Sequence, residues 1–228
     1  SDAEQLDIQR LWQRVAEDYA PFDIDVTTEE PTSAQWSSNK VAWAMITPTT
    51  DANGVSLPHN GYGGIAYVGI FNTSSCRYYS PAWIALQGME ASSEATSHEL
   101  GHNMGLSHDG TAAGGVEYHP GYAATATSPS WGPIMGAPYG RNVIQWSKGE
   151  YYDANQTQDD LAIIAARCAY RGDDFGDSMG KASPLPMADT VTVSGTGRVE
   201  TSSDPDVFVF STGTGTVTFA ATTYKCAV

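Results

Sequence analysis

Hydrophobic positions recur every three or four residues in two long segments, which predicts amphipathic helices at residues 3–20 and 159–170. A third helix is predicted at about residues 93–104, where good helix formers follow Ser92 or Ser93, either of which is a suitable N-cap.

Short apolar or alternating runs predict four strands in the same region, at residues 22–26, 41–46, 64–71 and 78–86, the last interrupted by Pro81. From residue 173 the sequence pattern changes: short runs that alternate hydrophobic and polar residues are separated by Gly, Ser and Asp, and no helical periodicity is present. We therefore predict an α+β domain at residues 1–172, followed by a small β-sandwich-like segment at residues 173–228.

Composition then limits the partners. Hydrophobic residues make up 41% of the chain, which is enough for a globular core, and the formal net charge is −15. Such a polyanion repels phosphate backbones, so we do not expect a nucleic-acid partner. No apolar run reaches the roughly 20 residues that cross a bilayer, so no membrane span is expected.

Three cysteines are present, and none has the CxxC spacing of a zinc cluster. One disulfide with one remaining thiol is the simplest count, and three buried thiols are the alternative. The chain opens with Ser1-Asp2-Ala3 and shows no signal peptide, so we expect a processed, secreted form.

The strongest chemical signal is the segment HELGHNMGLSHD at residues 98–109. On a helix, His98 and His102 lie one turn apart on one face and can bind the same metal ion. Gly105 suits the positive φ that ends a helix, and the reversed chain can then deliver His108 as a third ligand. Three neutral nitrogen ligands predict zinc with an open fourth position.

That open position makes the segment a candidate hydrolytic site. Zinc lowers the pKa of a water molecule toward about 7 and polarises a carbonyl group. The carboxylate of Glu99, beside the first ligand, is the predicted general base. A single histidine more often packs in the core or lies at the surface without binding a metal. Here each of the five motif positions has its own structural or chemical role in a metal site, which favours metal binding.

The segment resembles the motif of the metzincin zinc endopeptidases, most closely the adamalysin or reprolysin branch, in which Asp109 is also typical. The resemblance implies a twisted mixed sheet with an active-site helix and a C-terminal helix. It also implies protein or peptide substrates and a methionine turn beneath the zinc, for which GPIMGAPYG supplies Met135. We expect a monomer.

The resemblance implies further roles. GGIAYVGIF is similar to the family's edge strand, on which extended substrate pairs, with Gly64, Ile65, Ala66 and Tyr67 as candidate contacts. Pro138 and Tyr139 correspond to the wall of a substrate pocket. A disulfide of the family corresponds to Cys76 with Cys168, which leaves Cys226 as the odd thiol.

Other features depart from the family pattern or lie outside it. Position 137 is Ala, where astacins and serralysins place a tyrosine that reaches the zinc, so Tyr139 is not expected to act as an auxiliary ligand. His59 and His119 lie in loops rich in Gly and Pro, where solvated side chains are expected. The acidic cluster of Asp173, Asp174 and Asp177 is a possible calcium site, with a solvated linker as the favoured alternative. Residues 173–228 resemble, more loosely, the start of bacterial pre-peptidase C-terminal-type β modules.

Three functions remain open at this point. The leading one is a secreted zinc endopeptidase with Glu99 as general base. The alternatives are a non-protease HExxH hydrolase of small amides and a catalytically silent binding protein that keeps the zinc scaffold. The sequence does not reveal the cleavage preference, because pocket shape depends on loop conformation.

Overall fold

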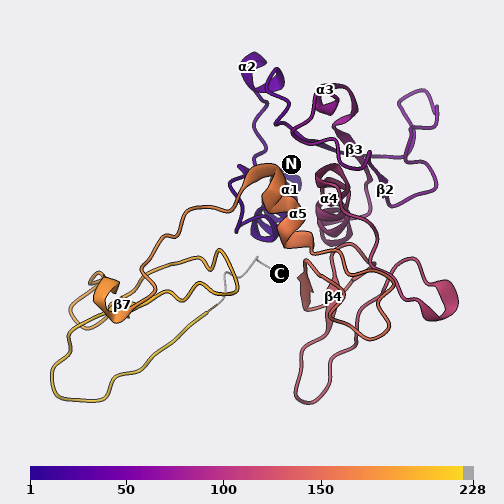
Figure 1. Cartoon of the computed structure of the whole chain (residues 1–228). Coiled ribbons are helices and arrows are strands. Elements are labelled where there is room, and N and C mark those ends of the chain that lie inside the picture. The colour runs from indigo at the N-terminus through magenta and orange to yellow at the C-terminus, as the bar shows by residue number, and fades with distance from the viewer. Residues whose placement is uncertain (223–228) are drawn as a thin grey trace. The chain divides into compact units, whose positions relative to one another are not determined.

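The computed structural model describes residues 1–222 and divides into two compact units (Figure 1). The first contains Ser1–Tyr19 and Asp25–Ala169, and the second contains Ala20–Ile24 and the residues from Tyr170 onward. Cys226 lies outside the described residues. Within residues 1–222, no helix combines the length and the apolar character needed to cross a bilayer.

The first unit is built on a mixed three-stranded sheet with the order β1-β3-β2. β1 (Trp43–Thr47) runs parallel to β3 (Pro81–Ala85), and β2 (Gly64–Ile65) runs antiparallel to it. Pro81 begins its strand, where its missing N–H costs no ladder bond, so it does not interrupt the strand as predicted. The mixed α and β architecture agrees with the predicted fold class.

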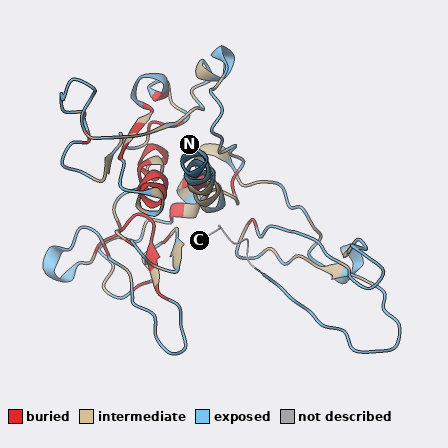
Figure 2. Ribbon diagram, turned by 180° about the vertical axis from the view of Figure 1, so that it is seen from behind, coloured by how far each residue is buried: buried red, intermediate tan, exposed pale blue. Residues whose placement is uncertain are grey.

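Two helices form the layer next to this sheet. α1 (Asp2–Asp18) begins at a capping box between Ser1 and Glu4, and α4 (Met89–Met104) is almost entirely buried (Figure 2). The helices are joined by Ser97, whose hydroxyl donates to Asp18 and whose carbonyl accepts from the hydroxyl of Tyr19. The core between α4 and the sheet consists of small and aliphatic side chains, namely Ala82, Ile84 and Ala95 with Ala44, Ile46, Ala66 and Leu100.

α4 begins at Met89, four residues before the predicted start, and its N-cap is Gly88. The predicted N-caps were wrong because Ser92 and Ser93 are buried inside the helix. The Ser92 hydroxyl accepts from Gln87 N, and the Ser93 hydroxyl donates to the carbonyl of Glu90. Small hydroxyl side chains allow α1 and the sheet to approach this helix closely.

The rest of the unit surrounds α4. It contains α2 (Ser33–Trp36), α3 (Cys76–Tyr79), the 3-10 turn η1 (Ala113–Gly115), β4 (Trp131–Pro133), β5 (Val143–Gln145) and α5 (Asp160–Cys168). β4 and β5 pair in parallel. α5 confirms the predicted C-terminal helix and is capped by the Asp159 carboxylate.

Three strand predictions were wrong in whole or in part. The strand predicted at 78–86 begins only at Pro81, because Tyr78 and Tyr79 belong to α3. Residues 22–26 form no strand, and Phe22 makes an isolated bridge to Tyr170. The predicted strand at 64–71 keeps only Gly64–Ile65, because the chain then turns toward the end of α4. There Gly69 N donates to the carbonyl of His102 and Phe71 N donates to the carbonyl of Asn103.

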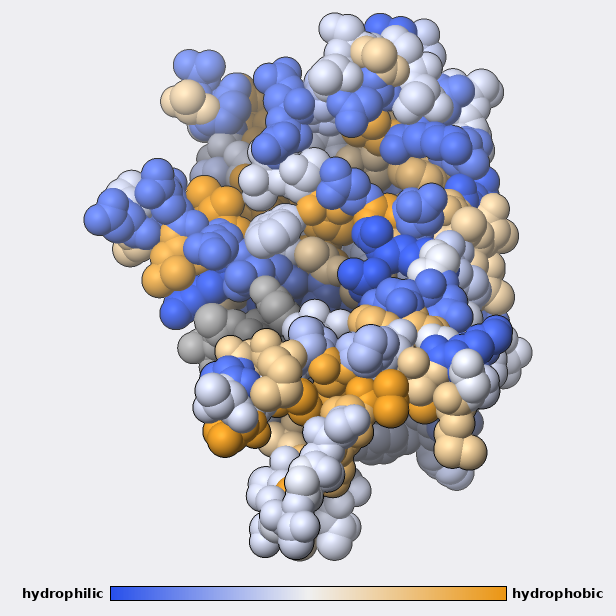
Figure 3. All heavy atoms as spheres, turned by 90° about the vertical axis from the view of Figure 1, so that its left-hand side faces the viewer, coloured by the Kyte–Doolittle hydropathy of each residue, from blue (hydrophilic) through white to orange (hydrophobic). Residues whose placement is uncertain are grey.

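The second unit has little regular structure. Its described residues contain the 3-10 turn η2 (Met179–Lys181) and one parallel pair, β6 (Ser183–Pro184) with β7 (Phe208–Val209). A β-sandwich is therefore not shown in this part of the chain. The Phe175 and Phe208 rings pack at 4.6 Å between centroids, but Met179, Val191 and Phe219 are exposed. On the face drawn in Figure 3, hydrophobic residues lie at the surface among hydrophilic ones.

Candidate active site

The last turns of α4 carry the first two candidate metal ligands. The Nδ1 atoms of His98 and His102 lie 2.9 Å from the carbonyl oxygen of Ile134 and 2.8 Å from that of Leu106. A carbonyl can only accept, so each Nδ1 carries the hydrogen and each Nε2 keeps its lone pair. Burial and the neighbouring His102 lower the pKa of His98 to about 3, and burial lowers the pKa of His102. Both rings are therefore neutral, as metal ligands must be.

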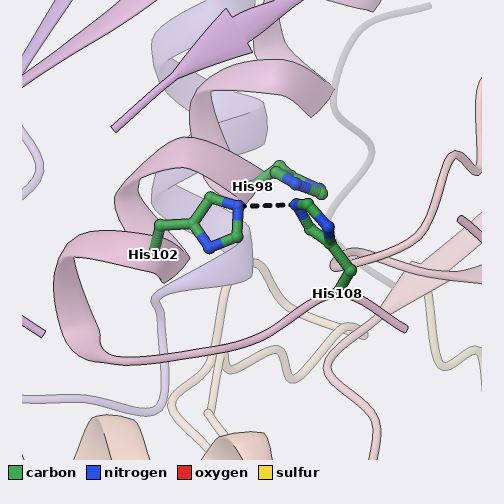
Figure 4. Close-up of side chains that lie close together, drawn as sticks. All are labelled: His98, His102 and His108. Atoms are coloured by element: carbon green, nitrogen blue, oxygen red, sulfur yellow. Dashed lines mark hydrogen bonds between the residues drawn. The ribbon is translucent and has the colours of Figure 1, made fainter. Parts of the chain in front are cut away.

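The chain reverses after α4 and delivers the third ligand. Gly105, at a φ of 118°, ends the helix in the left-handed conformation predicted for it. His108 then faces the helix, and its Nε2 lies 3.0 Å from Nε2 of His102 (Figure 4). Ring nitrogens of the three histidines all lie within 4.8 Å of one another.

This arrangement fits a zinc ion. The third Nδ1, on His108, lies 2.9 Å from Oε1 of Glu117, so all three Nδ1 atoms have oxygen acceptors. The three Nε2 lone pairs then face one another, which is unfavourable unless a cation lies between them. An all-imidazole ligand set suits zinc rather than calcium or magnesium. The sequence therefore predicted correctly that His98, His102 and His108 come together.

Glu99 lies next to these ligands and is 6% exposed. Burial raises its pKa to about 8, and its Oε2 has no hydrogen-bond partner among the described residues. The edge strand comes very close to this side chain: a Cβ at Gly64 would lie 2.5 Å from Glu99 Oε1. A buried carboxyl group with an unused oxygen can exchange a proton with a molecule that enters the cleft, and a zinc ion held by the neighbouring histidines would favour its ionised, proton-accepting form.

Met135 lies beneath the helix that carries the ligands and is fully buried. Its sulfur packs against Gly101, where an added Cβ would lie 2.7 Å from Sδ. The same segment supports two metal-site positions, because Ile134 accepts from His98 and the carbonyl of Met135 accepts from Asp109 N. The residue predicted for the methionine turn thus lies at the base of the site.

The predicted substrate contacts lie in different settings. Gly64 and Ile65 form β2, at one edge of the sheet, whereas Ala66 and Tyr67 follow the strand. The carbonyl of Tyr67 accepts from Nδ2 of Asn103, so it is already engaged. Of the two residues predicted for the pocket wall, Tyr139 is exposed near Gly63 and lines a pocket. Pro138 is buried, and a Cβ at Gly132 would lie 2.7 Å from its own Cβ.

Sequence reasoning missed the segment from Glu117 to His119. Glu117 accepts from His108, and the Tyr118 ring lies 4.3 Å from the His108 ring between centroids. His119 is 5% exposed, its N donates to the carbonyl of Asp109, and its carbonyl accepts from Ala137 N. Three adjacent residues with polar or aromatic side chains in a Gly-rich segment were the available signal, but no periodicity marks them.

Both loop histidines were wrongly predicted to be solvated. His119 is buried as described, and its Nδ1 accepts from Gly121 N at 2.8 Å. His59 is 0% exposed, stacks on the Trp83 ring, and has its Nε2 3.3 Å from the carbonyl of Thr47. Loop composition predicts turns well but does not reveal which turn folds back onto a sheet.

The predicted disulfide between Cys76 and Cys168 is not formed. The Cys76 thiol is buried and donates to the carbonyl of Val41 at 3.3 Å. The Cys168 thiol donates to the carbonyl of Ile164 on its own helix at 3.1 Å. The prediction was carried over from the family, and here each sulfur donates to a backbone carbonyl.

Comparison with known proteins agrees with this site. A family model described as Metallo-peptidase family M12B Reprolysin-like matches residues 14–109, less than half of the chain. The match covers most of the sheet region, α4 and all three histidines, and it supports a metallopeptidase of the kind that uses zinc and acts on proteins or peptides. The adamalysin branch fits this match. No curated protein matches the chain.

Proposed function

We propose that this chain is a secreted zinc-dependent endopeptidase that hydrolyses peptide bonds with Glu99 as general base. The observation that carries the proposal is the position of a buried carboxyl group, with one oxygen unused, beside three histidines whose Nε2 atoms converge. A catalytically silent scaffold gains nothing from a buried carboxyl group at this place, since burial without a partner is unfavourable.

The residues divide the reaction between them. Zinc held by His98, His102 and His108 would supply a Lewis acid for the scissile carbonyl and for a water molecule. Glu99 takes a proton from that water as its oxygen adds to the carbonyl carbon. When the C–N bond breaks, Glu99 passes the proton to the leaving nitrogen, so the carboxylate is restored.

An extended substrate fits the open edge of the sheet. β2 pairs with β3 on one side, and within the described residues no strand pairs with its other side. A peptide that adds to this edge would gain backbone hydrogen bonds beside Gly64, where the absence of a side chain brings the backbone against Glu99. This favours polypeptides over small amides as substrates.

The test is hydrolysis of a denatured protein and of a mixed peptide library by the zinc-loaded chain. Glu99→Gln should lose about 10²–10⁴-fold in rate while it binds one equivalent of zinc. Glu30→Gln is the matched control, because Glu30 is exposed and the described residues give its carboxylate no partner. Unchanged hydrolysis in Glu99→Gln would refute the proposed base.

The same experiment separates the alternatives. Stoichiometric zinc binding without hydrolysis of any substrate would indicate the silent binding protein. Hydrolysis of small amides without cleavage of denatured protein would indicate the non-protease hydrolase. Removal of zinc with a chelator should abolish cleavage, and added zinc should restore it.

Other predictions stay open to direct tests. The domain boundary at residue 172 is tested by limited proteolysis, and the monomeric state by light scattering. Secretion is tested by comparing the culture medium with the cells of the source organism. The proposed β-sandwich-like segment at residues 173–228 is tested by a crystal structure that includes this segment.

Calcium also stays a prediction for the second unit. Two groups of acidic residues, which share Asp173, bring their carboxylate oxygens together. Within each group the oxygens lie within 4.8 Å of one another, and the groups are Asp173–Glu200–Asp204 and Asp173–Asp174–Asp206. Asp177, which was part of the predicted cluster, belongs to neither group. Carboxylates that lie this close repel one another unless protons or cations compensate their charge. Calorimetric titration with calcium tests the site, and an absence of binding at millimolar calcium would refute the prediction.

A further inference from the structure

A pocket of about 340 Å³ opens at the first turns of α4, the helix that also carries the proposed catalytic base. It is lined by residues 87–91, Glu94, Tyr139 and Gly140. A volume of this size accommodates one long side chain of a peptide.

The backbone at Gly63 and Gly64 links the pocket to Glu99. The site of a Cβ on Gly63 is 3.4 Å from Gln87 Nε2 and 3.5 Å from the Tyr139 hydroxyl, so both lining residues touch this backbone. The next residue, Gly64, lies directly against Glu99. A peptide bond held at Glu99 therefore has a neighbouring side chain within reach of the pocket.

The lining is acidic because of the spacing along α4. Glu90, Glu94, His98 and His102 follow one another at intervals of four, so the row of metal ligands continues toward the helix N-terminus as two carboxylates. No lysine or arginine is among the lining residues. Both carboxylates belong to the wall of one small pocket.

Only part of this negative charge is compensated. Arg14 Nη2 lies 3.2 Å from Oε1 of Glu94, but Oε2 of Glu94 is buried and has no hydrogen-bond partner within the described residues. The Glu90 side chain is exposed, and the described residues give it no ion pair. Arg14 pairs with Glu94, so within the described residues no ion pair compensates the charge of Glu90 in the pocket wall.

We infer that this pocket receives a lysine or arginine side chain of the substrate, next to the scissile bond, and that Glu90 and Glu94 determine this specificity. The inference rests on the proposed peptidase function. The alkyl part of such a side chain would lie against Met89, Ala91 and the Tyr139 ring, and its charged end would meet the carboxylates. A leucine or phenylalanine would desolvate Glu90 without compensation.

The test uses peptides that differ only at one residue beside the cleaved bond, with Arg, Lys, Leu or Glu at that position. We expect the parent protein to cleave the Arg and Lys peptides with a kcat/KM about 10-fold above the Leu peptide, the size of one charge-assisted hydrogen bond. The Glu peptide should be the poorest substrate. A preference for Leu, or equal rates for all four, would overturn the inference.

Variants identify the residues responsible. Glu90→Gln combined with Glu94→Gln should reduce the ratio of Arg to Leu cleavage about 10-fold, and Glu30→Gln should leave it at the parent value. If loss of the Arg14 partner unfolds the double variant, Glu90→Lys alone is tested. It should lower kcat/KM for the Arg peptide and raise kcat/KM for the Glu peptide. An Arg to Leu ratio that stays at the parent value in these variants would refute the assignment. Failure to cleave any peptide would instead refute the underlying peptidase function.

Discussion

One outer contact of the metal site differs from the other two and allows a sharp test. His98 and His102 donate to backbone carbonyls, whereas His108 donates to a side chain, Glu117, at 2.9 Å. Only the His108 contact can therefore be removed by a substitution without changing the backbone. We predict that Glu117→Ala weakens zinc binding while the rest of the site stays in place.

The magnitude follows from the exposure of Glu117. Loss of the partner of a metal-bound histidine generally weakens metal affinity about 10–100-fold. The Glu117 side chain is 64% exposed, so solvent screens its charge, and the Tyr118 ring still packs on His108. We therefore expect an increase in the zinc Kd of about 10-fold, at the lower end of this range, or roughly 1.4 kcal/mol.

Competition with a chromophoric chelator measures the zinc Kd for the parent and the variants. Glu117→Gln retains an oxygen acceptor for the histidine and should fall between the parent and Glu117→Ala. Glu30→Gln should match the parent, and thermal unfolding of the metal-free proteins checks that the fold is intact. A Kd for Glu117→Ala within about twofold of the parent would refute the reasoning.

Three further predictions concern the glycines at the site and one buried acid. Gly101→Ala should destabilise the chain by about 1 kcal/mol, measured by urea unfolding. Overpacking of the new methyl group against Met135 costs about 1–3 kcal/mol, and the better helix propensity of alanine offsets about 1 kcal/mol of this. An increase in stability would contradict the packing. Gly64→Ala should displace the Glu99 carboxylate and slow peptide hydrolysis about 100-fold, while the zinc affinity stays unchanged. Hydrolysis at the parent rate would show that the position of the carboxylate is unimportant. Burial raises the pKa of Asp160 to about 8, so between pH 4 and 8 the folded chain keeps a proton that the unfolded chain releases, and stability falls as pH rises. Asp160→Asn should remove this contribution of up to about 1.4 kcal/mol per pH unit from urea unfolding curves, and an unchanged pH dependence would refute it.

Local sequence signals predicted much of the candidate site. The spacing of His98, His102 and His108, with Gly105 between them, depends only on helix geometry and on one left-handed residue, and all four lie as expected. The helices at the two ends of the first unit were predicted for the same reason, because a period of 3.6 residues is a local property.

Features that depend on distant partners were predicted less well. Residues 22–26 alternate like a strand, but the structure forms no strand there and gives Phe22 an isolated bridge to Tyr170. α4 extends back to Met89 with Gly88 as its N-cap, and no side chain caps this end, so the start of the helix carries no side-chain capping signal. Glu117 reaches His108 only through the fold of the intervening turn, where Thr111 N donates to the carbonyl of Val116.

The central claim is that three imidazoles hold one zinc ion. X-ray absorption at the zinc edge of the protein loaded with one equivalent tests it most directly. The account predicts a shell that contains three imidazole nitrogens at about 2.0–2.1 Å and no sulfur, reduced to two imidazoles in His108→Ala. A shell of oxygen alone, or one that contains sulfur, would contradict it.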